Sequence, residues 1–505
     1  MIRWSTAVLA VSLCATPAFA QGKVLLETWD AAYLSGNRSG YVHTIAQEVE
    51  RGGKKLIRTS VALSLTIKRF EDTVTISMEN GNYETPDGQI TGVFSKLVQG
   101  KLQQQEITGE VVGKELKLTL NGNRPLLPAP WNPKVVSLYK QQTIFRDRKL
   151  KPDEKFNYLS FEPSINLVLK TEVIAKGYRE VELVGSKQKK KLLQVETVPD
   201  KVDFVREGKK EKMQLPIVQT YLDEDLLPVK SEVEVPGFGV VVMYRTTKEK
   251  ALAPVSGGLD LGVSQLVRLK NRILRPHETT AAVYRITIRG DNPEKAFSSD
   301  DRQQVKNVQG NTFELHVRAN GNGAAPGKEP AAEFSQSSYF ITSADGKVKE
   351  LARQAVGAEA DSWKKALKIE RWVNKHMRFT SHETLATADH VARTLEGDCT
   401  EYAMLTAAMC RAEGIPSRTA IGLIYAEPRE IQRAPCFAFH MWTEVWIKGR
   451  WIPLDATLGK GYVGATHLKI TDSSWPPEER TSTPIFPVTA VVGRVGIEVL
   501  SAETR

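Results

Sequence analysis

Cys399 is the residue whose setting most directly suggests chemistry. It stands in the stretch Gly-Asp-Cys-Thr-Glu-Tyr-Ala at 397–403, where a run of helix-forming residues begins. A cysteine in the first turn of a helix lies near free backbone amides and the positive end of the helix dipole, and both stabilise a thiolate. Only the thiolate is a good nucleophile, so this position favours a reactive Cys399. The alternative is an inert buried cysteine, which is the commoner case for this residue type.

His440 and Asp455 lie on two strand-like segments that could supply the rest of a catalytic site. Lys448 and Gly449 separate these segments, which predicts a hairpin with a two-residue turn. In that register Trp442 faces Asp455, so Asp455 becomes the diagonal neighbour of His440 on one face of the sheet. A carboxylate there would hold the imidazole in one tautomer and favour its protonated form, which in turn favours a thiolate. A slip of one residue would break this geometry.

Helical segments and further strands must position these three residues. Residues 347–356 and a segment that begins near Asp361 predict two helices. A third helix is expected over residues 399–413, with Gly414 as its stop signal. This helix is apolar nearly all round, which predicts burial at the centre of its domain. Strands are expected at residues 419–425, 437–447, 451–454 and 490–499.

The first half of the chain has the pattern of β-structure. Apolar residues at 61, 63, 65 and 67 alternate with smaller or polar ones, and similar alternation recurs at 74–78 and 165–173. Turn-forming pairs such as Asn80-Gly81 and Asn121-Gly122 separate these runs. No strong helical periodicity interrupts residues 24–250. We expect a large antiparallel β domain, in one piece or in two similar halves.

The predicted fold class is therefore α+β, with the catalytic core at the C-terminus preceded by large antiparallel β domains. The expected divisions are a signal peptide at 1–20, a β-rich domain at 21–255, a small β domain with a linker at 275–335, a catalytic core at 336–480 and a C-terminal strand or extension at 481–505.

Residues about 345–475 resemble the core of the transglutaminase-like superfamily in its bacterial exported form. The resemblance rests on residues 397–403, 414–418, 440–445 and 451–457, with Met441 where the family more often has alanine. It implies a papain-like core in which Cys399, His440 and Asp455 serve as nucleophile, general base and orienting acid. Members of the family act on amide bonds by thiol acyl transfer. The function expected here is hydrolysis of peptide or amide bonds, or glutamine–amine crosslinking, through a thioester.

Composition and charge set the expected partners. The chain has 505 residues, is 41% hydrophobic and 25% charged, and carries a formal net charge of +10. The basic residues form short runs without interleaved aromatic residues, so nucleic acid is not expected as a partner. A protein or peptide substrate is expected, with a component of the cell envelope as a further candidate. No cofactor or metal is expected.

The N-terminus predicts export. Arg3 precedes an apolar run, and Ala18-Phe19-Ala20 matches a signal-peptide cleavage site before Gln21. The run is too short for a permanent transmembrane helix, and no other segment is long and apolar enough. We therefore expect a periplasmic or secreted protein. Cleavage would remove Cys14 and leave Cys399, Cys410 and Cys436, an odd number that requires at least one free or intermolecular thiol.

Several alternatives stay open at this stage. The core could be catalytically silent and only bind protein or cell wall. The N-terminal β region could carry lipid or lipoprotein, which a deep apolar cavity would support. A zinc site from Cys399, Cys436 and His440 lacks the usual close-spaced ligand pair. The backbone amide of Cys399 is the expected oxyanion donor, with the regions of Trp363 and Phe379 as guesses for a second.

Overall fold

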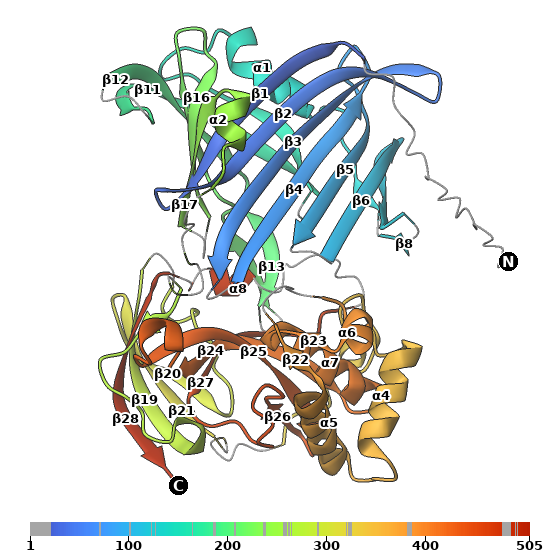
Figure 1. The fold of residues 1–505 in the computed structure, drawn as a ribbon, viewed down its shortest axis with the longest axis vertical. Helices are drawn as coiled ribbons and strands as arrows, with labels where there is room; N and C mark the ends of the chain where they lie inside the picture. Colours follow the sequence, from blue (N-terminus) through green and yellow to red (C-terminus); the bar gives the residue numbers. More distant parts are fainter. Residues whose placement is uncertain are drawn as a thin grey trace, which may run out of the picture.

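A computed structural model describes residues 22–505. It leaves out residues 70–71, 100–102, 123, 127, 164, 185–187, 207–208, 236–238, 256–259, 261–262, 264, 290–291, 320, 322–325, 381–385, 477–485, 490 and 492. The predicted signal peptide and Cys14 therefore lie outside the described residues. Two lobes are visible in Figure 1, a curved sheet coloured blue to green and a mixed α/β lobe coloured yellow to red.

The N-terminal lobe is built on one antiparallel sheet, fifteen-stranded in its described part. Its path runs β10-β11-β12-β15-β16-β17-β1-β2-β3-β4-β5-β6-β7-β8, with β9 paired to β7, so the last strand, β17, returns to pair with the first. The strands are β1 (Val24–Leu34), β2 (Asn37–Arg51), β3 (Lys54–Arg69), β4 (Asp72–Glu84), β5 (Ile90–Gln99), β6 (Gln103–Val112), β7 (Glu115–Leu120), β8 (Arg124–Pro125), β9 (Ala129–Pro130), β10 (Lys155–Glu162), β11 (Leu167–Glu182), β12 (Lys189–Pro199), β15 (Val218–Leu222), β16 (Pro228–Val235) and β17 (Gly239–Thr246). A separate hairpin, β13 (Val202–Arg206) with β14 (Lys209–Met213), interrupts the path between β12 and β15.

Two short helices lie in this lobe, where the sequence shows no strong helical periodicity. They are α1 (Leu138–Asp147), which Ser137 caps, and α2 (Lys248–Leu252). In α1 only Thr143, Ile144 and Phe145 are buried, so the helix has no long apolar stripe that a periodicity argument could detect. Ile144 and Phe145 pack against Leu193 and other buried residues of the sheet.

The C-terminal lobe contains a small antiparallel sheet in the order β20-β21-β19-β28. Its strands are β19 (Thr279–Ile288), β20 (Gln303–Gln309), β21 (Thr312–Arg318) and β28 (Val495–Thr504). A short 3-10 helix, η1 (Pro276–Glu278), leads into β19. The expected C-terminal strand begins later than residue 490 and pairs with β19, so the end of the chain completes this sheet.

A second sheet and its helices form the rest of the C-terminal lobe. The sheet has the order β18-β25-β24-β27, and β26 pairs with β25. Its strands are β18 (Val267–Arg268), β24 (Ser417–Ala426), β25 (Cys436–Ile447), β26 (Arg450–Leu454) and β27 (His467–Ser473). Around it lie α4 (Gly346–Val356), α5 (Ser362–His376), α6 (Ala388–Thr394), α7 (Cys399–Ala412), α8 (Phe486–Thr489), η2 (Ala332–Phe334), η3 (Arg429–Ile431) and the short parallel pair β22 (Arg378–Phe379) and β23 (Glu396–Gly397).

Helix α7 is the centre of this lobe. Every side chain from Glu401 to Arg411 is buried, as the apolar character of the segment predicts. Thr443 of β25 donates a hydrogen bond to the carbonyl of Ala403 at 3.0 Å, and Ser417 of β24 donates to that of Ala407 at 2.8 Å. These bonds fix the helix on the sheet. The predicted fold class is confirmed: the large antiparallel sheet precedes a mixed α/β core.

Candidate active site

Cys399 is the first residue of α7, as its sequence setting predicts. The turn that delivers it requires glycine at 397, where φ is +151° and a Cβ would come within 2.3 Å of the Glu401 side chain. Asp398 caps the helix, and Glu401 accepts a hydrogen bond from the Asp398 backbone N–H at 3.0 Å. This reciprocal arrangement is a capping box, which defines the helix start sharply.

The capping box changes the expected electrostatics of the thiol. Asp398 already accepts the Thr400 N–H at 2.8 Å, so the first turn offers the sulfur fewer free amides than the sequence suggested. Burial and the negative charge of Asp398 raise the pKa of the Cys399 thiol above its usual value. The hydrogen bond with His440 and the backbone N–H of Met441 act in the opposite direction. Stabilisation of a thiolate therefore depends mainly on His440.

The hairpin of β25 and β26 has the predicted register. Ile447 pairs with Arg450, and the ladder continues to Thr443 opposite Leu454, one residue before Asp455. As expected, Asp455 reaches His440: its Oδ2 lies 2.8 Å from the His440 Nε2. Both side chains are buried. Since Nε2 bonds the carboxylate, Nδ1 is the ring nitrogen left to face Cys399.

The charge state of His440 follows from its two neighbours. Burial lowers the pKa of His440, but the charge of Asp455 and the hydrogen bonds to Asp455 and Cys399 outweigh this and raise it to about 10. For Asp455, the favourable contacts with His440 overcome the effect of burial and hold the pKa well below its usual range. At neutral pH the pair is an imidazolium on a carboxylate, an arrangement suited to proton transfer at Cys399.

His467 is a residue that the sequence analysis missed. Its Nε2 lies 3.0 Å from the same Asp455 Oδ2 that bonds His440. The opposite oxygen, Oδ1, accepts the Thr457 N–H at 3.0 Å and the Thr457 hydroxyl at 2.6 Å. His467 comes from β27, which was not predicted, although the alternation of polar and apolar residue types from His467 to Thr471 was a usable signal.

Helix α5 supports the loop that follows Asp455. Asn374 donates hydrogen bonds to the carbonyls of Ala456 at 2.8 Å and Thr457 at 3.2 Å. One turn earlier, the buried Glu370 accepts the Gly461 N–H at 3.2 Å. Burial and the charge of Asp455 raise the pKa of Glu370 to about 7. Sequence analysis found this helix, but it could not reveal that two of its polar side chains face the loop.

Glu444 lies four residues after His440 on β25, but its carboxylate bonds residues other than the candidate catalytic three. It is buried and bonds Arg418 at 2.7 Å and Lys469 at 3.2 Å. Arg418 also bonds Asp472 at 2.9 Å, and Lys469 bonds Asp300. These five residues form an ion cluster that ties the small sheet region to the central sheet.

The structure describes the surroundings of Cys410 and Cys436 and bears on the zinc site considered for Cys399, Cys436 and His440. Cys399, Cys410 and Cys436 are all free thiols. Burial raises the pKa of both Cys410 and Cys436, the latter to about 11. The Cys436 thiol donates to the carbonyl of Ala426 at 3.4 Å. Among the described residues, the one close group of three ligand-type side chains is His440, Asp455 and His467, without either cysteine. Both imidazoles hydrogen-bond one carboxylate oxygen, so this group is a hydrogen-bonded network.

One guess for the second oxyanion donor is wrong. Lys365, near Trp363 at the start of α5, bonds Glu413 at 2.9 Å. Glu413 follows the last turn of α7, about 20 Å along the helix from Cys399, so the region of Trp363 is remote from the thiol. The region of Phe379 does lie beside the site, because Phe379 pairs with Gly397 and the Thr380 N–H bonds the Gly397 carbonyl at 2.9 Å.

Part of the C-terminal lobe is similar in sequence to known proteins. Residues 349–456 match the model of the transglutaminase-like superfamily. A stretch of 84 residues is 34% identical to the kyphoscoliosis peptidase of Mus musculus, covering 16% of this chain and 12% of that protein. The chain therefore spans only a small part of the length of the curated relative that it matches.

Solved structures give a weaker likeness. A candidate cysteine protease from Cytophaga hutchinsonii is 16% identical, with 45% of this chain and 91% of that one covered and a TM-score of 0.30. The periplasmic domain of TgpA from Pseudomonas aeruginosa is 14% identical, with 37% and 89% covered and a TM-score of 0.25. We draw no functional conclusion from likeness at this level.

Proposed function

Because residues 349–456 form a transglutaminase-like core, we propose that this protein is an exported thiol enzyme that acts on amide bonds of proteins or peptides. Cys399 is the nucleophile, His440 the general acid and base, and Asp455 the residue that orients His440. The observation that carries the proposal is the 2.8 Å hydrogen bond between His440 and Asp455, with Cys399 bonded to the same imidazole at the start of α7.

The reaction would proceed in two halves. The Cys399 sulfur attacks the carbonyl carbon, a C–S bond forms, and the oxygen becomes an oxyanion that the Cys399 N–H can stabilise. The C–N bond then breaks as the His440 imidazolium gives its proton to the departing amine, leaving a thioester. Water or a primary amine attacks the thioester while His440 takes a proton from it. The C–S bond breaks, and the product is a carboxylic acid or a new amide.

Selective alkylation tests the site before any substrate is known. Burial raises the pKa of all three thiols, but His440 contacts Cys399 and opposes this effect there, so iodoacetamide at neutral pH should modify Cys399 much faster than Cys410 or Cys436. The His440→Ala substitution should slow the modification of Cys399 because the imidazolium partner is lost. Peptide mapping by mass spectrometry locates the label. Equal reactivity of Cys399 and Cys410 in the native protein would show that Cys399 is not an activated nucleophile.

A second assay separates hydrolysis from crosslinking. Casein is incubated with the protein and a labelled primary amine. Incorporation of the amine with release of ammonia identifies glutamine acyl transfer, whereas new peptide termini identify hydrolysis. The Cys399→Ala variant is the matched control and should do neither.

The proposal includes export of the protein. It rests on the leader-like sequence at residues 1–20, which lie outside the described residues. Within the part of the chain that the structure covers, no helix combines the length and apolar character that crossing a membrane requires. N-terminal sequencing of the protein from an expressing bacterium should give Gln21 as the first residue. An intact Met1 in the fractionated protein would contradict export through this leader.

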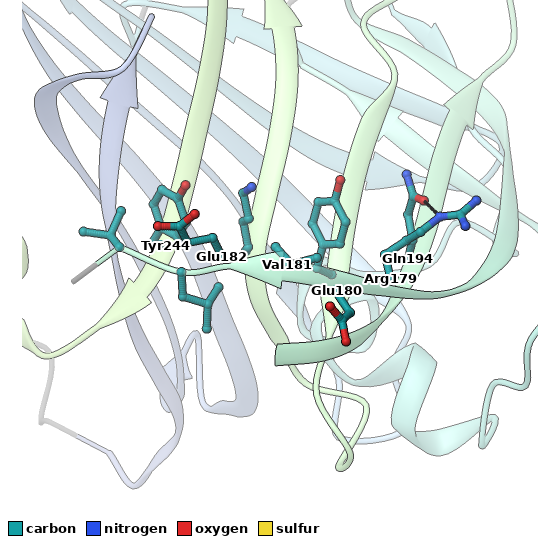
Figure 2. Close-up of a pocket in the computed structure, with 10 residues that line it drawn as sticks. Arg179, Glu180, Val181, Glu182, Gln194 and Tyr244 are labelled. Carbon is teal, nitrogen blue, oxygen red and sulfur yellow. Dashed lines mark hydrogen bonds between the residues drawn. The ribbon is translucent and has the colours of Figure 1, made fainter. Parts of the chain in front are cut away.

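The cavities of the N-terminal sheet do not favour the lipid-carrier alternative. One such cavity has a volume of about 980 Å³ (Figure 2). It is lined by Arg179, Glu180, Val181, Glu182, Leu183, Val184, Gln194, Tyr221, Lys230 and Tyr244. Gln194, Tyr221, Lys230 and Tyr244 are direct cross-strand partners and form a polar row over β12, β15, β16 and β17. An acyl chain would gain little from such a lining.

A further inference from the structure

Two imidazoles share one carboxylate oxygen behind the proposed nucleophile. His440 Nε2 and His467 Nε2 lie 2.8 Å and 3.0 Å from the same Oδ2 of Asp455. An ionised carboxylate only accepts hydrogen bonds, so both nitrogens must carry hydrogen. Burial lowers the pKa of His467 to about 4, so His467 is a neutral donor at physiological pH. His440, by contrast, carries the positive charge.

We propose that His467 is a positioning residue of the thiol site, which acts through Asp455 by occupying part of the carboxylate's hydrogen-bonding capacity. The proposal rests on the proposed function for the meaning of the site, but its geometry does not depend on the substrate. His467 fixes the carboxylate against His440 and weakens the hold of Asp455 on the His440 proton. General acid catalysis needs a proton that is held firmly enough to protonate a leaving amine and loosely enough to be released.

The surroundings hold His467 in this pose. The side chain is fully buried, and β27 places it opposite Ile424, while His440 lies opposite Gly422 on the same strand β24. The indole of Trp442 packs edge-on against the His467 ring, with 5.3 Å between ring centroids. The centroids of the two imidazole rings are 5.8 Å apart, with 66° between the ring planes. A buried ring that packs against both Trp442 and His440 cannot turn away from Asp455 without displacing these neighbours.

The His467 Nδ1 atom supports a role beyond packing. It is buried and has no hydrogen-bond partner among the described residues. An unpaired buried polar atom is unfavourable, and a leucine or phenylalanine of similar size would avoid that cost. The polar ring is therefore a poor choice for a core that needs only volume, and its contact with Asp455 is what it contributes.

Other charged groups reach this network from each neighbouring element. Glu370 approaches Asp455 from α5, and its pKa of about 7 means that its charge changes near neutral pH. Cys399 contacts His440 from α7. His277 of η1 interacts electrostatically with Asp455, His440 and Lys460, and the buried Arg302 acts on His467. Because several of these groups titrate, the test compares variants across a pH series and does not rely on one rate.

Replacement of His467 by glutamine or phenylalanine tests the proposal. Glutamine can place an amide N–H near the position of Nε2, whereas phenylalanine keeps a ring without a donor. In His467→Phe the Asp455 carboxylate no longer bonds a second imidazole, so it should hold the His440 proton more tightly. The pKa of His440 should rise by about one unit, which is a tenfold change in its protonation equilibrium. His467→Gln should stay close to the unmodified protein. Selective ¹³C labelling of the eight histidines allows NMR titration of His440 without any substrate.

The rate of Cys399 alkylation over the same pH series gives the second readout. We expect its His440-dependent inflection to move with the NMR value in His467→Phe and to return in His467→Gln. If the phenylalanine variant does not fold, His467→Asn replaces it, because that amide stops one carbon short of Asp455. Unchanged His440 titration in a folded donor-free variant would overturn the proposal, as would equal shifts in the glutamine and phenylalanine variants. Failure of the proposed function is distinct: Cys399 would then be unreactive in the unmodified protein, whatever His440 does.

Discussion

At the scale of single residues, the site depends on a balance of charges around one sulfur. Asp398 gives α7 its N-terminal cap but places a negative charge beside Cys399, which raises the pKa of the thiol. His440 supplies the opposing positive charge because Asp455 keeps it protonated. The resting thiol is therefore less acidic than its place at a helix start alone would make it. Removing either charge should change its reactivity in a defined direction.

Asp398→Asn should make Cys399 more reactive. Asparagine caps a helix as well as aspartate does, so the fold should hold while the negative charge is removed. The change is best made in a Glu401→Gln background, because Glu401, with a pKa raised to about 8 by burial and Asp398, could otherwise ionise and replace the lost charge. We expect iodoacetamide to alkylate Cys399 at pH 7 about threefold to tenfold faster than in Glu401→Gln alone.

Asp361→Asn is the matched control for this change. Asp361 caps α5 as Asp398 caps α7, accepting the Lys364 N–H at 2.9 Å. It lies near the far end of α7, since Lys365, one helical turn further along α5, bonds Glu413. Its substitution should leave the alkylation rate unchanged. A rate in Asp398→Asn that is no higher than in its background would show that the cap carboxylate does not control the thiol.

Asp455→Asn should remove both activity and a pH-dependent part of stability. Loss of the orienting carboxylate should reduce amide turnover by about 10²- to 10⁴-fold. His440 has a folded pKa near 10, above its unfolded value of about 6.5, so the pair stabilises the fold fully below pH 6.5 and loses this contribution as pH rises through 10. Urea unfolding at pH 6.5 and pH 10.5 should show a larger difference between the two proteins at the lower pH. A difference that does not change with pH would contradict the raised pKa of His440.

At the scale of elements, the β25–β26 hairpin and helix α5 position Asp455 beside His440. The turn between β25 and β26 has positive φ at both Lys448 (+49°) and Gly449 (+81°), the conformation that suits a two-residue hairpin. From this turn the register carries Asp455 to the correct face. Beyond the ladder, Asn374 of α5 holds the next two carbonyls. The site is therefore sensitive to changes in the hairpin that touch none of its residues.

Gly449→Ala tests this dependence. Alanine at a positive φ costs about 1 kcal/mol, and its Cβ would lie 2.5 Å from the Cβ of Pro326, so the hairpin must shift. Gly113→Ala is the control, because Gly113 also has a positive φ (+63°) in a hairpin turn but has open space around it. We expect both variants to lose stability in thermal unfolding and only Gly449→Ala to lose most of its amide turnover. Equal activity in the two would mean that the hairpin turn does not govern the site.

At the scale of the whole molecule, the C-terminal lobe is one unit built from segments far apart in sequence. Strand β28 at the end of the chain pairs with β19, and the small and central sheets share one hydrophobic core. The ion cluster of Glu444, Arg418 and Lys469, with their partners Asp300 and Asp472, joins the two sheets. Tyr339 packs against this core and also against a core of the N-terminal lobe.

Glu444→Gln should destabilise this unit strongly. Removal of the Glu444 charge takes from Arg418 and Lys469 the carboxylate that they share and leaves them with the more exposed Asp472 and Asp300, at a cost of about 2–3 kcal/mol. The positive neighbours hold the pKa of Glu444 below its usual range and that of Asp300 at about 2, despite burial. The stabilisation is therefore present above the unfolded carboxyl pKa of about 4 and is lost as pH falls toward 2. Chemical unfolding at pH 7 and pH 3 should show the gap between the two proteins narrowing at low pH.

Glu498→Gln provides the surface control for the cluster. Glu498 bonds Arg285 at a similar distance, 2.8 Å, but its side chain is 54% exposed. Surface pairs of this kind contribute roughly 0–1 kcal/mol, so the control should be nearly as stable as the unmodified protein. If Glu444→Gln and Glu498→Gln lower the free energy of unfolding equally, the buried cluster stabilises the fold no more than a surface ion pair does.

Much of the candidate site could be predicted because its signals are local. The helix start at Cys399 depends on the residues that cap it, and the approach of Asp455 to His440 depends on a two-residue turn and strict alternation along two strands. Short-range rules of this kind act within a few residues, so a single sequence contains them. The catalytic roles of the three residues stay a prediction until the alkylation and turnover measurements are made.

The tertiary structure alone decided which side chains surround that group. His467 comes from β27, Glu370 and Asn374 from α5, and none has a fixed spacing to Asp455 that a pattern could express. Glu444 lies on the same strand face as His440, yet it forms ion pairs with Arg418 and Lys469. Contacts of this kind depend on how whole strands and helices pack, and packing is set by the sum of many weak interactions along the chain. Sequence thus determined the candidate catalytic group, and tertiary packing determined the network that holds it.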